Sequence, residues 1–118
     1  MKQIPIYDAT EPVTCTIGAS EIPARLELVE RMRTQVSSVD RTEHGMVLHF
    51  AGGTAVEADV RQFAVDEKRC CQFWGFEVLT EDGLALRWDG PPSARALLDQ
   101  LEAYFRGEGS IDALVQLL

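Results

Sequence analysis

The sequence holds few of the residues on which most catalytic and metal sites depend. It has two histidines, His44 and His49, and its three cysteines include no Cys-x-x-Cys pair. Structural zinc takes four ligands and usually a spaced cysteine pair, so these cysteines do not suit a zinc finger. General acid–base catalysis has few candidates. We expect both histidines to face solvent, one in a turn and one on the outer face of a sheet.

Long apolar runs and an excess of positive charge are also missing. No run approaches the roughly 20 residues of a membrane-spanning helix, and residues 1–5 lack the layout of a secretion signal. The formal net charge of −8 argues against nucleic acid and anionic membranes as main partners. We therefore expect a cytoplasmic protein whose cysteines are thiols.

Length and composition favour one domain. The chain has 118 residues, enough to bury a hydrophobic core without disulfide or metal cross-links. Its composition, with 46% hydrophobic and 25% charged residues, is typical of a soluble globular protein. We expect a single domain over 1–118, with a lead-in at 1–12. A short apolar C-terminal helix at 110–118 could not stand alone, so it would dock on the domain or build a homodimer.

Hydrophobic patterning predicts an α+β fold. Alternation favours a strand at 13–17 and two hairpins, and helical spacing favours three longer helices. The predicted order is a strand at 13–17, a helix at 20–36, strands at 39–42 and 46–50, a helix at 54–71, strands at 73–79 and 84–88, and a helix at 94–105. Its first six elements, βαββαβ, match a ferredoxin-like sandwich with an added strand and C-terminal helices. Right-handed crossovers would place strand 13–17 beside strand 46–50.

Local signals refine the ends of these helices. Ser20 is a candidate N-cap for the first helix, and Thr54 with Glu57 matches a capping box for the second. Gly107 is a candidate C-terminal cap for the third long helix. A short edge strand at 4–7 is a further expectation.

The helix that ends near Cys71 carries the most unusual combination of residues. At about 100° per residue, Glu67, Cys70 and Cys71 fall on its apolar stripe, close enough for their side chains to meet. An inward carboxylate costs free energy unless it is paired. Glu67 could form a buried ion pair with Arg61, Arg69 or an arginine elsewhere, or it could accept a thiol proton or bind a metal. In the first helix we expect Arg25 to lie on the solvent face.

The cysteines allow two interpretations. Cys15, Cys70 and Cys71 could simply pack as small apolar residues. Alternatively, thiolates are nucleophiles and ligands for soft ions, and the predicted topology brings Cys15 near the other two. This second interpretation predicts a site for a soft metal or metalloid ion at Cys15, Cys70 and Cys71, with Glu67 beside them.

Several short motifs resemble a known family. They are Glu67-x-x-Cys70-Cys71-x-Phe73, Leu84-x-Leu86, Gly90-Pro91-x-x-Ala94 and the earlier Cys15-Thr16-Ile17. Together they resemble a family of small uncharacterised bacterial proteins with a Glu-x-x-Cys-Cys-Pro-Phe signature, of which some are encoded near mercury-type metal-responsive regulators. The resemblance covers roughly residues 13–105, and Gln72 replaces the family's proline. It implies a thiol or heavy-metal context by association and no established activity.

Three classes of function remain open from the sequence. The first is a cytoplasmic protein that binds a soft ion through Cys70 and Cys71, with Cys15 as a third ligand. The second is a small thiol-redox enzyme, although the absence of a Cys-x-x-Cys motif argues against it. The third is a noncatalytic interaction or ligand-binding module with structural cysteines, since ferredoxin-like frames host many functions.

Overall fold

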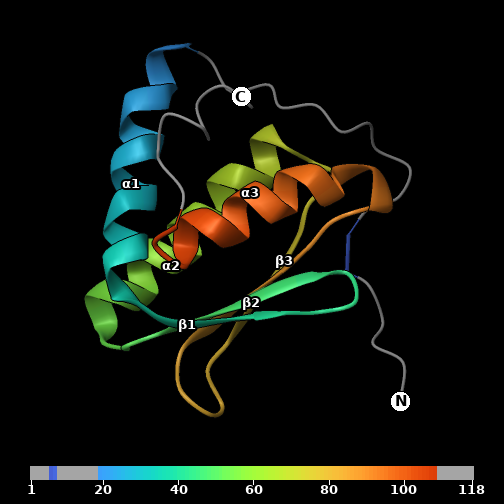
Figure 1. Cartoon of the computed structure of the whole chain (residues 1–118). Helices are drawn as coiled ribbons and strands as arrows, with labels where there is room; N and C mark the ends of the chain where they lie inside the picture. The colour runs from blue at the N-terminus through green and yellow to red at the C-terminus, as the bar shows by residue number, and fades with distance from the viewer. Residues whose placement is uncertain (1–5, 8–18, 109–118) are drawn as a thin grey trace.

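The computed structural model describes residues 6–7 and 19–108, and it confirms the mixed α+β class (Figure 1). The elements are η1 (Ala19–Glu21), α1 (Ile22–Gln35), β1 (Val36–Arg41), β2 (Gly45–Phe50), α2 (Thr54–Cys70), β3 (Gly75–Leu79), β4 (Ala85–Asp89), η2 (Pro92–Ala94) and α3 (Arg95–Phe105). The three predicted long helices and both hairpins are therefore confirmed. Within the described ranges no helix is long and apolar enough to span a membrane.

The four strands form one antiparallel sheet in the order β1-β2-β4-β3. The two hairpins join along β2 and β4, where Met46 lies opposite Trp88 and Leu48 opposite Leu86. These four side chains are buried, as alternation along a half-covered strand requires. On the outer strand β1, a shift of register interrupts the pairing between Val36 and Ser38.

The strand order departs from the ferredoxin-like expectation. Strand β2 is flanked by β1 on one side and β4 on the other, so the predicted pairing of strand 46–50 with strand 13–17 is not observed. The βαββαβ topology is not confirmed. Cys15, strand 13–17 and the predicted helix at 110–118 lie outside the described residues. Ile6 and Tyr7 are described and do not belong to a strand.

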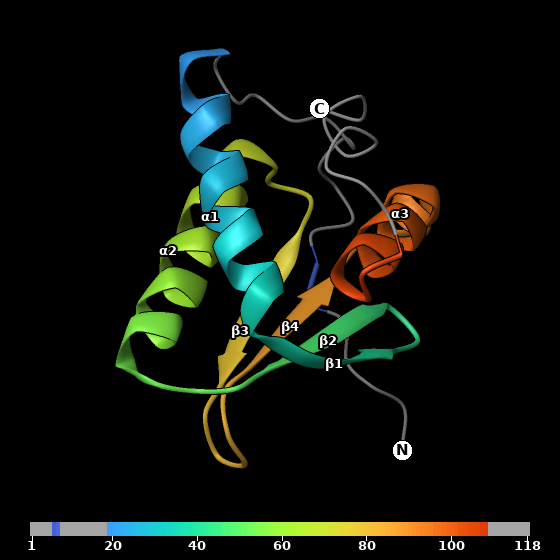
Figure 2. The ribbon, with the colours of Figure 1, turned by 60° about the vertical axis from the view of Figure 1, so that its left-hand side comes forward.

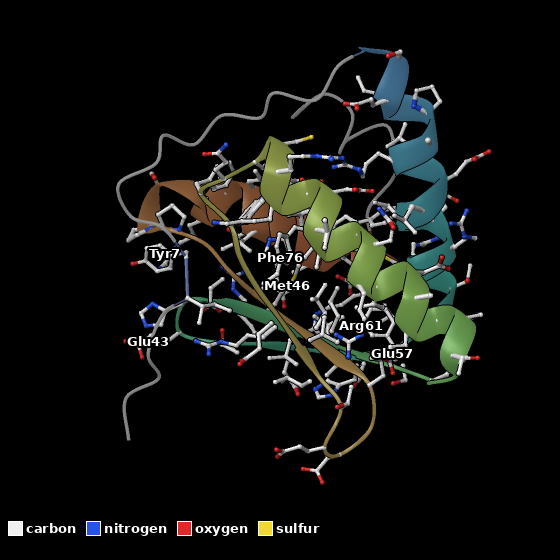
Figure 3. The ribbon with its side chains drawn as sticks, turned by 180° about the vertical axis from the view of Figure 1, so that it is seen from behind. Tyr7, Glu43, Met46, Glu57, Arg61 and Phe76 are labelled. Carbon is white, nitrogen blue, oxygen red and sulfur yellow. The ribbon has the colours of Figure 1, made fainter. Side chains whose placement is uncertain are left out.

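All three helices lie over the same face of the sheet and enclose the core (Figure 2). Met46 and Phe76 point from the sheet toward the helices (Figure 3). Trp88 lies at the centre, with its ring centroid 5.3 Å from that of Phe63 on α2 and 5.4 Å from that of Trp74. Large aromatic surfaces of this kind supply much of the burial that stabilises a small domain.

The helix ends differ from the predicted caps. Glu21 and Gly53 occupy the N-cap positions of α1 and α2, and neither helix has a side-chain cap. The predicted Ser20 cap and the Thr54–Glu57 capping box are therefore wrong. Glu57 instead accepts a hydrogen bond from Arg61 Nε at 2.9 Å, one turn along α2. After α3, Gly107 has a φ of 85° and donates to the carbonyl of Tyr104, which confirms its predicted role.

Gly45 provides a test of the sheet packing. A Cβ at this position would overlap the backbone of Trp88 and Asp89 on the paired strand β4. We expect Gly45→Ala to lower the free energy of unfolding by about 1–3 kcal/mol or more, because backbone atoms cannot move aside as a flexible side chain can. Urea denaturation monitored by circular dichroism measures this loss. Unchanged stability would mean that β2 and β4 do not approach this closely.

Candidate functional site

Helices α1 and α2 lie side by side and run in opposite directions (Figure 2). Two ion pairs join them. Arg25 Nη1 binds Glu67 Oε2 near one end of the helix pair, and Arg31 Nε lies 3.3 Å from Asp59 Oδ2 nearer the other. Only the first pair is buried, since Arg25 and Glu67 are each 8% exposed.

The buried pair also contacts a sulfur atom. Arg25 Nη2 lies 3.5 Å from Cys70 Sγ, and Cys70 keeps its thiol and is 7% exposed. One guanidinium thus bridges a carboxylate and a thiol sulfur that lie three residues apart on α2. We call Arg25, Glu67 and Cys70 the arginine–thiol cluster.

Burial and charge act in opposite directions on the arginine–thiol cluster. Burial by itself lowers the pKa of Arg25, but the hydrogen bond to Cys70 and the charge of Glu67 outweigh it, so this pKa is raised. Burial raises the pKa of Glu67, and the attraction to Arg25 offsets only part of that rise. Burial therefore opposes both charges of the cluster, and for Glu67 the attraction to Arg25 offsets only part of that cost.

Cys71 follows directly and is in a different chemical state. Its sulfur is part of a disulfide bond, and the residue is 1% exposed. The expectation that all the cysteines are thiols is wrong for Cys71. The sequence shows two adjacent cysteines here, but it does not show which cysteines form a disulfide, because that depends on the tertiary structure. The disulfide partner lies outside the described residues.

The chain turns sharply at Cys71 without the proline of the resembled family. The N–H of Cys71 donates to the carbonyl of Glu67 at 2.7 Å, and the N–H of Trp74 donates to the carbonyl of Cys71 at 3.2 Å. Lys68 Nζ donates to the Trp74 carbonyl at 2.7 Å, which closes the turn. Since Phe73 and Trp74 are buried, the core also anchors the segment that follows the cysteines.

The inward positions of Glu67 and Cys70 on α2, and of Cys71 directly after it, were predicted and are confirmed by their burial. Of the alternatives for Glu67, the structure shows an ion pair with an arginine elsewhere, Arg25. The prediction that Arg25 faces solvent is wrong. The signal that could have found it is spacing, because the buried residues of α1 are Arg25, Leu28, Val29 and Met32, an i, i+3, i+4, i+7 series.

The histidines lie away from the arginine–thiol cluster. His49 Nε2 lies 2.9 Å from Asp40 Oδ2 across the β1–β2 pair, and the ring of His44 lies against that of Tyr7 (Figure 3 labels Tyr7). Among residues 6–7 and 19–108, no three histidine, cysteine or acidic side chains are grouped so that they could hold a metal ion.

No protein-family model, curated protein or solved structure matches the chain. The resemblance to the cysteine-pair family therefore stays a prediction.

Replacing Arg25 tests the cluster. In Arg25→Met the Glu67 carboxylate loses the attraction that lowers its pKa, so its folded-state pKa rises further above the ordinary 4.5. A carboxyl group whose pKa is raised by folding makes the protein less stable as pH rises from its unfolded pKa to its folded pKa. We expect a deficit relative to wild type that is small below pH 4.5 and grows above it, to about 3–5 kcal/mol once Glu67 is ionised.

The double variant Arg25→Met/Glu67→Leu should recover most of this stability and lose the added pH dependence, because no charge is left buried. Arg61→Met is the matched control on the solvent face of α2, where Arg61 pairs with Glu57 (Figure 3). It should cost no more than about 0.5 kcal/mol at any pH. Urea denaturation across a pH series provides the data. A deficit in Arg25→Met that does not change with pH would contradict a buried, ionisable Glu67.

Proposed function

We propose that this chain is a thiol–disulfide redox protein whose reactive sulfurs are those of Cys70 and Cys71. The observation that carries the proposal is a disulfide at Cys71 directly after a thiol, Cys70, that a buried arginine contacts. The chain has three cysteines, so we propose Cys15 as the partner of Cys71. In this scheme two neighbouring thiols compete for one disulfide partner.

The redox step is a thiol–disulfide exchange. An external thiolate bonds to one sulfur of the disulfide, the protein S–S bond breaks, and the other sulfur leaves with the electron pair and takes up a proton. A second external thiolate then attacks the mixed disulfide and releases the remaining protein thiolate. One protein disulfide is reduced while two external thiols become one disulfide.

The arginine–thiol cluster supplies electrostatics for this exchange. Exchange proceeds through thiolates, and the Arg25 guanidinium places a positive charge 3.5 Å from Cys70 Sγ. A purely structural disulfide gains nothing from a neighbouring buried ion pair, which costs desolvation energy. The presence of that pair therefore supports a chemical role for the sulfurs.

A redox titration tests the proposal. Wild-type protein is equilibrated in dithiol–disulfide buffers of graded potential, and its thiols are then alkylated and counted by mass spectrometry. We expect reversible reduction with a midpoint above about −300 mV, since structural disulfides lie below that value. Peptide mapping of the oxidised form should join Cys15 to Cys71.

Single Ser variants serve as controls for the titration. Cys71→Ser should remove the couple or shift the bond to Cys70, whereas Cys70→Ser should keep the bond and slow the exchange. A midpoint below about −300 mV, or a bond that forms equally fast in Cys70→Ser, would contradict the proposal.

A second candidate is soft-ion binding by the reduced protein. Once Cys71 is reduced, two adjacent thiols lie beside Glu67 and the Arg25 charge, and thiolates prefer soft metal and metalloid ions. The described residues hold no three-ligand group, so such an ion would take two sulfurs or add Cys15.

Mercuric ion and arsenite are the probes for this second candidate. In a competition assay on reduced protein, we expect wild type to bind tightly and Cys70→Ser/Cys71→Ser to lose binding while its circular dichroism spectrum is retained. The Cys15→Ser variant tells a three-sulfur site from a two-sulfur one. Equal binding by wild type and the double variant would rule out a soft-ion site at this pair.

A further inference from the structure

The adjacent cysteines at the end of α2 are in different chemical states. Cys70 keeps its thiol, whereas the sulfur of Cys71 is part of a disulfide. Both residues are buried, with exposed fractions of 7% and 1%, so accessibility does not explain why the disulfide forms at Cys71. A competition between two neighbouring thiols therefore needs a contact that selects one of them.

The end of α2 separates the two cysteines. Cys70 is the last residue of α2, and the backbone of Cys71, with a φ of −124° and a ψ of 79°, has left the helical range. Cys70 therefore keeps the position of a helical residue one turn after Glu67. Both of these residues contact Arg25, which belongs to α1.

The guanidinium of Arg25 gives both of its terminal nitrogens to this contact. Nη1 binds Glu67 Oε2, and Nη2 lies 3.5 Å from Cys70 Sγ. Arg25 is 8% exposed, so water has little access to replace either partner. A disulfide sulfur carries no charge in any state, which makes it a weaker partner for a guanidinium than a thiol that can ionise. A disulfide at Cys70 would therefore leave a buried N–H donor poorly satisfied, and this costs free energy.

We propose that Arg25 is a positioning residue that selects Cys71, and not Cys70, as the cysteine that enters the disulfide. This inference rests on the proposed redox function and names what decides the competition between its two sulfurs. The alternative pairing needs no oxidant. The Cys70 thiolate bonds to the partner sulfur of Cys71, that S–S bond breaks, and the Cys71 sulfur leaves with the electron pair and takes up the proton that Cys70 lost.

Differential alkylation measures the selection. Wild-type protein is equilibrated in a buffer of reduced and oxidised dithiothreitol, quenched in acid and unfolded, and its free thiols are alkylated with light N-ethylmaleimide. Its disulfides are then reduced and alkylated with the heavy reagent, and tandem mass spectrometry reads the label on each adjacent cysteine. We expect at least about fivefold more heavy label on Cys71 than on Cys70.

Replacing the guanidinium should remove this preference. Arg25→Met/Glu67→Leu leaves no buried charge, and its circular dichroism spectrum shows whether it is folded. We expect the ratio of heavy label on Cys71 to that on Cys70 to fall at least about fivefold, because the buried donor that disfavours a disulfide at Cys70 is gone. Arg61→Met, on the solvent face of α2, is the matched control and should keep the wild-type ratio. An unchanged ratio in the folded double variant would overturn the inference.

Single Ser variants provide a second measurement that does not need the double variant. Cys71→Ser forces the disulfide to Cys70, whereas Cys70→Ser keeps it at Cys71 and leaves a hydroxyl beside Arg25. At equilibrium we expect the bond in Cys71→Ser to be reduced at least about fivefold more readily than the bond in Cys70→Ser. Arg25→Lys has one nitrogen in place of the fork and should narrow this difference. Equal reducibility of the two bonds, or a difference that Arg25→Lys does not change, would contradict selection by Arg25.

Label positions and redox midpoints separate this inference from the redox proposal. A midpoint below about −300 mV, with a label ratio that falls in the double variant, would overturn the redox proposal and keep the selection by Arg25. A reversible couple above that value, with an unchanged label ratio, would overturn the selection alone.

Discussion

The buried ion pair between Arg25 and Glu67 is the constraint around which the helical layer is arranged. It joins α1 to α2 at the end of the helix pair where the cysteines lie. Two charges removed from water cost several kcal/mol each, and an apolar pair of similar volume would often pack as well or better. The same guanidinium contacts Cys70, so this costly burial lies next to a thiol sulfur.

The redox and metal-binding proposals concern the same sulfurs in two states. A disulfide sulfur offers no thiolate, so an ion could bind at Cys71 only after that bond is reduced. Oxidation and ion binding would then exclude each other. The redox proposal rests on the state that the structure shows, and the ion proposal rests on residue types. The first therefore has the stronger support.

The sequence predicted what depends on local pattern. Alternation predicted β3 and β4, and helical spacing placed Glu67 and Cys70 on the buried side of α2. The strand order was not predicted, because the pairing of β2 with β4 joins two hairpins that are separated by a whole helix. Arg25 was assigned to solvent because arginine is almost never fully buried unless it is paired. The spacing within α1 could have indicated its burial, but not its partner Glu67, which lies 42 residues away.

The interrupted pairing on β1 affects how copies of this protein behave at high concentration. Outer strands expose unpaired backbone groups and can recruit a strand from another molecule. On β1 the irregularity between Val36 and Ser38 bends the ladder, and exposed Asp40 places a charge along it. On β3, the outer strand at the other edge of the sheet, exposed Glu77 adds another charge. Among the described strands, both outer strands thus carry charges that disfavour pairing with a strand from another molecule.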